Sequence, residues 1–395
     1  MIPDFNARHT YLVIPAVVRN MTSLDTSRDV IVIGGGVVGL SIAWELARHG
    51  LSVAVLEQSQ FGQEASWAGA GLLPPGNPDK ATTLEARIRS ASHRLWPDWT
   101  EQLKSLTGID NGFRLCGGAE VVPSGRDESL DERISIWRSE GVVVESLEAS
   151  ELQERLPALN SRIRTGYFLP EMGQVRNPRH LKALIQACAL AGVDLRAGAG
   201  VIDFTREGER VVSVQTSCES FRAQDYIVAG GAWSRFLLQR AGAELPVEPI
   251  RGQIVLLQAA NVLFRHVIEV GSRYLVPRPD GRILIGSTEE RAGFEKRTTA
   301  GGIAGLIQFA QELVPAIADA QLERCWAGLR PYLPGGLPSI GRVPGTTNLS
   351  VAAGHFRAGL QLSPITAVLM RQLILNQAMA PWAKELAPSS IQDDA

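Results

Sequence analysis

The feature that most constrains the fold of this chain is a glycine turn with the spacing Gly-x-Gly-x-x-Gly, formed by Gly34, Gly36 and Gly39. An apolar run over residues 30–33 precedes the turn, and such runs are typical of strands buried on both faces of a parallel sheet. Residues 37–49 follow, with apolar side chains at helical spacing. Strand, glycine turn and helix in this order predict the first part of a βαβ unit.

A second strand is predicted over residues 52–56, and Glu57 stands at its carboxyl end. In a dinucleotide-binding unit the glycines allow a tight turn, close approach of a pyrophosphate and close packing of helix on strand. The helix N-terminus directs unpaired N–H groups at the phosphates. An acidic residue in the position of Glu57 accepts hydrogen bonds from ribose hydroxyls. The pattern predicts a dinucleotide site, with a turn that serves packing alone as the alternative, and it does not separate FAD from NAD.

Composition excludes several other classes of function. The 395 residues suffice for two or three domains. The chain has 39 Lys and Arg against 41 Asp and Glu, so its net charge is close to zero. It therefore has no strong positive field that would attract nucleic acid or anionic lipid. The four cysteines and six histidines have neither metal-ligand nor dense disulfide spacing, so we expect no metal site and a reducing, cytoplasmic location. No apolar run reaches the roughly 20 residues of a membrane helix, so we expect no membrane span.

Five segments along the rest of the chain carry a resemblance to a known family. They are Glu-Ala-Ser-Trp-Ala-Gly-Ala-Gly-Leu-Leu at 64–73, Ala-Gly-Gly-Ala-Trp-Ser at 229–234, Arg-Gly-Gln at 251–253, Trp-Ala-Gly-Leu-Arg-Pro at 326–331 and Gly-His-Phe-Arg-Ala-Gly-Leu at 354–360. In this order they resemble the FAD-dependent glycine oxidase and D-amino-acid oxidase family. Residues 286–289 and 293–296 are most similar to the glycine oxidases of thiamin biosynthesis.

The resemblance implies an α/β fold with two interleaved domains. A Rossmann-like FAD-binding domain would alternate with an α+β substrate domain that contains a large mixed or antiparallel sheet. The implied FAD-binding pieces are 29–76, 171–240 and 324–380, and the substrate-binding pieces are 77–170 and 241–323. We expect residues 1–28 to be an N-terminal extension, disordered or dispensable for folding, and residues 381–395 to be a C-terminal tail.

The resemblance also implies which residues contact FAD. The contacts lie at the glycine turn, after the second strand, along the small-residue stretch, at one position that meets the adenine, and in a loop around the pyrimidine edge of the flavin. The residues are Gly34, Gly36, Val37, Val38, Gly39, Glu57, Gln58, Ala65, Ser66, Ala70, Gly71, Leu72, Val201, Gly230, His355, Phe356, Arg357, Ala358, Gly359, Leu360 and Gln361.

The chain departs from its family at three places around the flavin. Residues 332–336, Tyr-Leu-Pro-Gly-Gly, stand where relatives usually carry a threonine and an aspartate, so the conformation of this loop is left open. Ala358 replaces a common asparagine, and Gln361 replaces an apolar residue. No cysteine follows Leu329, where sarcosine oxidases attach their flavin, so we expect non-covalent FAD.

Arg330 is the main candidate for substrate binding. It follows the apolar run Trp-Ala-Gly-Leu at 326–329. A partly buried guanidinium at this position requires an anion. Two parallel charge-assisted hydrogen bonds would hold and orient an amino-acid carboxylate, whereas the alternative is an internal salt bridge. The resemblance implies that Tyr274 also reaches the carboxylate, that Arg357 assists near the flavin, and that Leu72 limits the space above it. The alternatives are a core aromatic for Tyr274 and an ion pair with a structural acid for Arg357.

These features together predict a FAD-dependent amino-acid oxidase. It would convert glycine, and also sarcosine or small D-amino acids, to the imino acid with oxygen as acceptor, giving hydrogen peroxide and supplying thiazole synthesis in thiamin biosynthesis. Hydride transfer from the α-carbon needs a positioned substrate with a neutral amine and no base that removes a proton from carbon. His355 is therefore expected to shape its loop.

Three other functions remain open at this point. A quinone-linked D-amino-acid dehydrogenase shares the same pattern. A flavin-binding protein without turnover is favoured if loop 332–336 closes the pocket. An NAD-linked dehydrogenase leaves the segments 65–73 and 354–359 unexplained. The expected partners are a small amino acid or amine, oxygen, thiazole synthase as downstream acceptor and, by analogy with relatives, further copies of the chain in a homotetramer.

Overall fold

The computed structural model describes residues 27–123 and 130–389. All but the last two residues of the predicted N-terminal extension, 1–28, lie outside the described residues, and Arg28 already begins the first strand. Of the predicted C-terminal tail, residues 381–389 are described. They include the short 3-10 helix η3 (Pro381–Leu386), whose Ala383 and Leu386 are buried in the core.

A six-stranded sheet carries the glycine turn. Its strands lie in the order β19-β20-β13-β1-β2-β9, and only β19 runs antiparallel to its neighbour. Helix α1 (Val37–Ala47) joins the central strand β1 to β2, so the predicted βαβ unit and the Rossmann-like fold are confirmed. The bounds are β1 (Arg28–Ile33), β2 (Val53–Glu57), β9 (Asp194–Ala197), β13 (Ala223–Val228), β19 (Ser339–Arg342) and β20 (Leu349–Ala353).

Both faces of this sheet are buried, which explains its continuous apolar strands. Val30 and Val32 of β1 pack on the side of α1, whereas Ile31 and Ile33 pack on the opposite side. The first side is covered by α1, α3 (Leu84–Thr107), α6 (Asn177–Leu190) and α9 (Ser363–Ile374). The second side is covered by α7 (Ser234–Arg240) and an antiparallel sheet of β10 (Val201–Glu207), β11 (Arg210–Thr216) and β12 (Ser220–Phe221).

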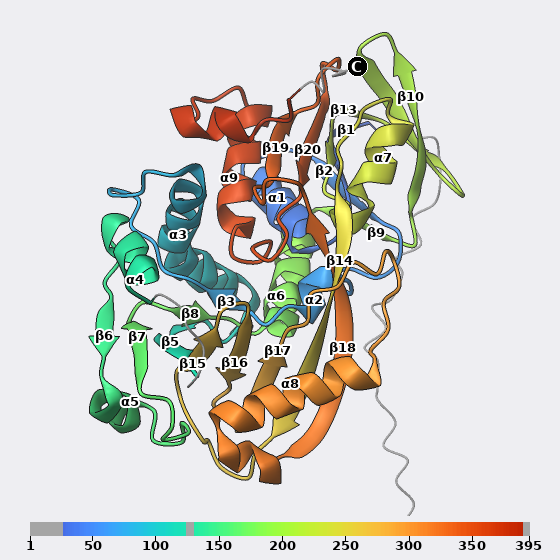
Figure 1. Cartoon of the computed structure of the whole chain (residues 1–395). Coiled ribbons are helices and arrows are strands. Elements are labelled where there is room, and N and C mark those ends of the chain that lie inside the picture. Colours follow the sequence, from blue (N-terminus) through green and yellow to red (C-terminus); the bar gives the residue numbers. More distant parts are fainter. Residues whose placement is uncertain (1–26, 124–129, 390–395) are drawn as a thin grey trace, which may run out of the picture.

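An eight-stranded sheet forms the second half of the molecule, as Figure 1 shows. Every pair of neighbours is antiparallel except β15 and β5, so the predicted large mixed sheet is confirmed. Its strands, in spatial order, are β18 (Gln321–Tyr332), β14 (Glu248–Gln258), β17 (Arg282–Gly286), β16 (Arg273–Pro277), β15 (Val267–Val270), β5 (Gly118–Val122), β7 (Thr165–Leu169) and β6 (Glu145–Leu147).

The two faces of the large sheet differ in their cover. Helix α8 (Ala300–Leu313) packs on one face, where Ile268 and Leu275 belong to the same buried cluster as Leu306 (Figure 1). The other face carries a second apolar cluster that includes Val267 and Val276, and helix α4 (Leu130–Ser139) packs beside it. The remaining elements are α2 (Ala65–Ala68), α5 (Ala149–Arg155), η1 (Gly231–Trp233), η2 (Pro315–Asp319) and a small sheet of β3 (Leu72–Leu73), β8 (Gly173–Gln174) and β4 (Arg114–Leu115).

The chain crosses from one half of the molecule to the other at residues that the sequence motifs do not indicate. The predicted boundary at residue 324 falls inside β18, because pairing with β14 carries that strand through to Tyr332. Helix α3 lies in the predicted substrate piece 77–170, yet Trp96 and Trp99 pack with α1 and α9. The division into two domains stays a prediction. Among the described residues, no helix is long and apolar enough to cross a membrane.

Candidate active site

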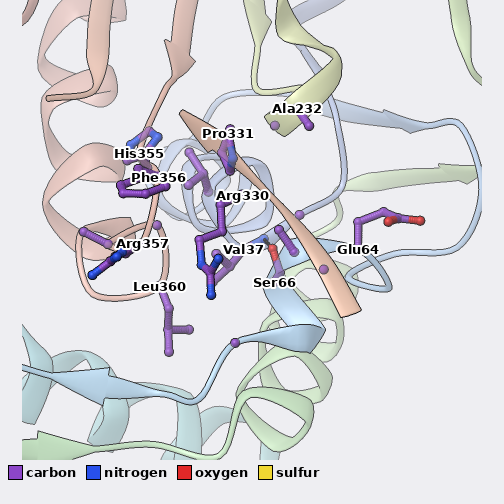
Figure 2. A pocket seen from close by; sticks show the side chains of 18 of the residues that line it. Val37, Glu64, Ser66, Ala232, Arg330, Pro331, His355, Phe356, Arg357 and Leu360 are labelled. Atoms are coloured by element: carbon purple, nitrogen blue, oxygen red, sulfur yellow. Dashed lines mark hydrogen bonds between the residues drawn. The ribbon is translucent and has the colours of Figure 1, made fainter. Parts of the chain in front are cut away.

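A cavity of about 870 Å³ lies where the two halves meet, and its volume is within the range of cofactor and small-molecule sites. All the predicted cofactor residues except Gly39 line it, as do the predicted substrate residues Arg330, Tyr274, Arg357 and Leu72. Figure 2 shows side chains from the α1 turn, from β18 and from the loop after β20 arranged around one space. The structure thus brings together residues as far apart in the sequence as Gly34 and Gln361.

At the first and third glycines of the turn, a larger side chain would clash with neighbouring backbone. Gly34 has a φ of 114°, and a Cβ added there would lie 2.4 Å from the carbonyl oxygen of Ala229. A Cβ on Gly39 would lie 2.0 Å from the carbonyl oxygen of Gly34. Gly39 therefore permits the packing of α1 against the turn and does not itself reach the cavity, which agrees with the role of the third glycine in dinucleotide folds.

The N-terminus of α1 opens into the cavity. Gly36 is its N-cap, no side chain caps the helix, and no acidic residue stands in its first turn. Gly36, Val37 and Val38 all line the cavity. The Val37 N–H donates to Ser66 Oγ at 2.9 Å, which joins the turn to the small-residue stretch. An uncapped helix N-terminus without a nearby carboxylate in its first turn fits a bound pyrophosphate.

Glu57 closes the same turn from the end of β2. Its Oε2 accepts from the Gly35 N–H at 2.8 Å, its Oε1 accepts from the Ser59 N–H at 2.9 Å, and its side chain lies at the cavity wall. An ionised carboxylate has about four acceptor positions. Glu57 can thus fix the turn and still accept hydrogen bonds from ribose hydroxyls.

The small-residue stretch is held by a buried arginine that the sequence did not indicate. Arg278 is 4% exposed, and its Nη2 donates to the Ala70 carbonyl at 2.8 Å. Its Nη1 donates to Gln174 Oε1 at 2.6 Å and to the Val175 carbonyl at 3.2 Å. Burial lowers the pKa of Arg278 to about 9. No motif signals this residue, because its partners come from two separate segments, at residue 70 and at 174–175.

The loop 355–361 is anchored from α3 and α9. The Gln361 carbonyl accepts from Trp96 Nε1 at 2.9 Å, and its side-chain amide donates to the Pro74 carbonyl at 2.9 Å. His355 is 3% exposed, and its Nε2 lies 3.0 Å from Thr366 Oγ1. Burial lowers the pKa of His355 to about 4, so the ring is neutral at neutral pH. Through these contacts, Gln361 and His355 hold the loop in position.

The unusual segment 332–336 turns away from the cavity. None of its five residues, all of them described, lines the cavity wall. The Tyr332 ring meets the Phe356 ring edge-on at 5.1 Å, and Leu333 packs where a Cβ on Gly354 would stand. The segment therefore leaves the cavity open, which removes the condition that would favour a flavin-binding protein without turnover.

Arg330 enters the cavity from β18 and meets no acid. Its guanidinium donates to the Thr288 carbonyl at 3.2 Å and to Ser287 Oγ, and no carboxylate among the described residues pairs with it. Burial lowers its pKa, and Tyr274 opposes that shift. A Cβ on Gly252 would lie 2.2 Å from either Nη atom, so glycine at that position leaves the room that the guanidinium occupies.

Tyr274 and Arg357 line the same cavity as Arg330. The half-buried Tyr274 ring covers Gly286, where an added Cβ would lie 2.5 Å from the phenol oxygen. Arg357 is bonded to the exposed carboxylate of Glu289 and is 44% exposed. Burial lowers the pKa of Arg357, whereas Tyr274 and Glu269 raise it. Arg357 thus combines an ion pair with a position at the cavity wall (Figure 2).

Glu269 on β15 is a cavity residue that sequence reasoning missed. It stands directly opposite Tyr274 in the register of β15 and β16. Burial raises its pKa to about 7, and Arg357 opposes this shift. The two-residue period of a strand could have indicated that Glu269 shares a face with Val267. Only the order of the strands in the sheet shows which side chains lie beside Glu269.

Cysteines and metal ligands contribute nothing visible to the cavity. The four cysteines are free thiols, and none of them lines the wall. Within residues 27–123 and 130–389, no group of three or more His, Cys, Asp and Glu side chains is placed to hold a metal ion.

The chain resembles known proteins both in sequence and in fold. Residues 29–373 match the family described as "FAD dependent oxidoreductase". The chain is 35% identical over 365 residues to a glycine oxidase of Pseudomonas putida, which covers 91% of this chain and 99% of that protein. It is 34% identical over 373 residues to a bifunctional ThiO/ThiG protein of Trichormus variabilis, covering 93% of this chain and 56% of that protein. The crystal structure of glycine oxidase from Geobacillus kaustophilus superposes with a TM-score of 0.85 and 33% identity, over 90% of this chain and 96% of that one.

Proposed function

The chain belongs to the FAD-dependent oxidoreductase family, and we propose that it oxidises the amine of glycine to the imine, with sarcosine and small D-amino acids as further substrates. It is a FAD-dependent amino-acid oxidase. The observation that carries the proposed substrate is Arg330, a half-buried guanidinium that faces the cavity without a carboxylate partner in the described chain. An amino-acid carboxylate supplies the anion that such a guanidinium requires.

The residues around the cavity fit FAD. The open N-terminus of α1 suits the pyrophosphate, Glu57 suits the ribose, and the segments 65–72 and 355–361 form the walls on which a flat ring can lie. FAD, when bound, supplies the acceptor for the electrons of the amine. We propose that it is held non-covalently, because no cysteine side chain lies at the wall.

The chain's own contribution to the reaction is positioning. Arg330 binds the substrate carboxylate by two parallel hydrogen bonds and so fixes the α-carbon, while Tyr274 approaches the same carboxylate from β16. The half-buried Leu72 limits the space available to a side chain. Arg357 assists from the loop that also carries His355. Holding a small substrate in one orientation and excluding water lower the barrier without a protein base.

The acceptor and the fate of the product belong to the same proposal. Oxygen takes the electrons and gives hydrogen peroxide, and the imino acid passes to a thiazole synthase. The ThiO/ThiG relative, of which this chain spans about half, supports the second step through its name. We place the enzyme in the cytoplasm, in keeping with its four free thiols, and expect a homotetramer.

The test is the visible spectrum of the purified holoenzyme, recorded anaerobically as glycine is added and again after air is admitted. We expect the flavin to bleach with glycine and to recover in air with one equivalent of peroxide. Bleaching that air barely reverses would identify a dehydrogenase that uses a quinone. Absence of bleaching with glycine, sarcosine and D-alanine would overturn the proposed substrates.

A further inference from the structure

The carboxylate of Glu269 lies on the cavity side of the large sheet. It alternates along β15 with Ile268, whose side chain packs beneath α8, and shares its face with Val267. In the register of the sheet it stands between Tyr274 of β16 and Glu120 of β5. Glu269 thus occupies the middle of a row of side chains that crosses the wall of the cavity opposite the α1 turn.

Glu269 differs from the other acids of this wall because no partner engages it. Glu120 accepts from the Tyr167 hydroxyl and forms an ion pair with Arg133. No hydrogen bond or ion pair to the Glu269 carboxylate occurs among the described residues. Arg357 is close enough to affect its pKa, but the Arg357 guanidinium is bonded to Glu289.

Besides Tyr274 and Glu120, the side chains around Glu269 are mainly apolar. Leu72, Met172 and Trp137 line the same part of the cavity, and the Trp137 N–H is used by Tyr167 at 3.1 Å. A carboxylate in such a wall is unfavourable unless a cation or a hydrogen-bond donor meets it. Burial accordingly raises the pKa of Glu269 to about 7. A ligand that brings a positive charge would satisfy the group.

Glu269 and Arg330 lie too far apart for one glycine molecule to reach both. Their strands, β15 and β18, are separated by β16, β17 and β14, which is roughly 19 Å across the sheet at about 4.8 Å per strand. The register also places Glu269 level with Trp326 of β18, four residues before Arg330, so the two backbones lie farther apart than this spacing. Arg330 reaches over Gly252 toward Ser287, and Tyr274 covers Gly286. The Tyr274 side chain therefore stands between the Arg330 guanidinium and the Glu269 carboxylate.

We propose that Glu269 is a specificity-determining residue that selects amino-acid substrates whose side chain or N-substituent ends in an ammonium group. The substrate carboxylate binds Arg330, and the extension passes Tyr274 to place its cation at Glu269. The inference rests on the proposed function, since it assumes that Arg330 holds the carboxylate. It further implies that a second carboxylate on the substrate is disfavoured, because Glu269 would repel it.

Three N-substituted glycines of similar length test this inference: N-(2-aminoethyl)glycine, N-propylglycine and N-(2-carboxyethyl)glycine. For each, kcat/KM is measured at pH 8 in the holoenzyme, and the dissociation constant is measured anaerobically from the change in flavin absorbance. In the native protein we expect the cationic compound to be preferred over the neutral one by about tenfold, and the neutral one over the anionic one. In Glu269→Gln both preferences should shrink to within about twofold.

The control is Glu323→Gln on β18 of the same sheet, an exposed residue outside the cavity whose carboxylate binds Arg282. It should keep the charge preference of the native protein. An equal preference in Glu269→Gln and the native protein would overturn the inference. So would a native protein that prefers the neutral or the anionic compound, and that result needs no variant to fold.

Glycine separates this inference from the proposed function. If glycine is not oxidised but the cationic compound still binds more tightly and loses that advantage in Glu269→Gln, the subsite stands and the proposed reaction fails. If glycine is oxidised and the three compounds bind alike, the reaction stands and the subsite fails.

Discussion

One wall of the cavity is made largely of backbone, and the wall opposite is made of side chains. The cofactor wall, residues 34–38, 65–72 and 355–361, offers an open helix N-terminus, a stretch of mostly small residues and a loop. The substrate wall consists of Arg330, Tyr274 and Glu269, which reach into the cavity from three strands of the large sheet. The first wall resembles that of a general nucleotide site, whereas the second can vary with the substrate.

The difference teaches where specificity can change without loss of the fold. Backbone N–H groups cannot be altered by substitution without moving the chain, so the cofactor wall depends on glycines that leave space. Side chains on neighbouring strands can be exchanged while the ladder of hydrogen bonds persists. Substitutions of the glycines in the first wall should therefore cost FAD binding, and substitutions in the second wall should change substrates while FAD stays bound.

The largest effect is expected at the packing glycine of α1. A Cβ in Gly39→Ala would lie 2.0 Å from the Gly34 carbonyl oxygen, so the turn must move and FAD should be lost together with about 1–3 kcal/mol of stability. The control is Gly305→Ala in α8, where nothing lies within 4 Å of the added Cβ. Flavin content of the purified proteins and thermal unfolding measure both effects. Full flavin content in Gly39→Ala would contradict this account of the turn.

Removal of the Arg330 guanidinium, which has no acidic partner in the described chain, should weaken substrate binding and leave FAD binding unchanged. In Arg330→Ala we expect kcat/KM for glycine to fall about a hundredfold or more through a higher KM, while FAD remains bound, because one side of a buried charge pair is truncated. Arg324→Ala, an exposed position on the same strand outside the cavity, should leave both unchanged. Unaltered glycine kinetics in Arg330→Ala would remove this residue from the substrate site.

A smaller loss is expected for the arginine behind the cofactor wall. Arg278→Met leaves the Ala70 and Val175 carbonyls without this donor, so we expect FAD to bind about tenfold more weakly. The matched control is Arg273→Met at the start of β16, an exposed residue whose guanidinium lies over the Phe309 ring on the other face. Equal FAD dissociation constants for the two variants would show that Arg278 does not position this segment.

The smallest effect concerns the pH dependence of stability at Glu269. Since its folded pKa of about 7 lies above its usual value, the folded state binds the proton more tightly, and this residue makes stability fall as pH rises from about 4.5 to 7. Facing groups are Glu120, Tyr167, Tyr274 and Arg357. Glu269→Gln should raise the Tm of the holoenzyme by about 2 °C at pH 8 and little at pH 5. A rise of equal size at both pH values would exclude titration of Glu269 as its cause.

Much of the cofactor wall could be predicted from sequence because its determinants are local. Gly34, Gly36 and Glu57 fall within one βαβ unit, and the local geometry of that unit sets the spacing between them. The family and its FAD dependence, predicted from five short segments, are confirmed. The role of each predicted site residue stays a prediction, although all but Gly39 line one cavity.

Other features were decided only by tertiary structure. Arg278 holds two segments that are far apart in sequence, and Glu269 becomes a cavity residue because β15 lies between β16 and β5. The boundary predicted at residue 324 falls inside β18 because pairing with β14 extends that strand.

The sequence by itself determined the glycine turn and the βαβ unit around it, because both depend on residues that are neighbours along the chain, and it indicated FAD through the resemblance of five separate segments. Only the tertiary structure decided that Arg330 lacks an acidic partner in the described chain and that Glu269 lacks one as well. Whether a charge is paired depends on which strands lie side by side, and this order is fixed by long-range packing.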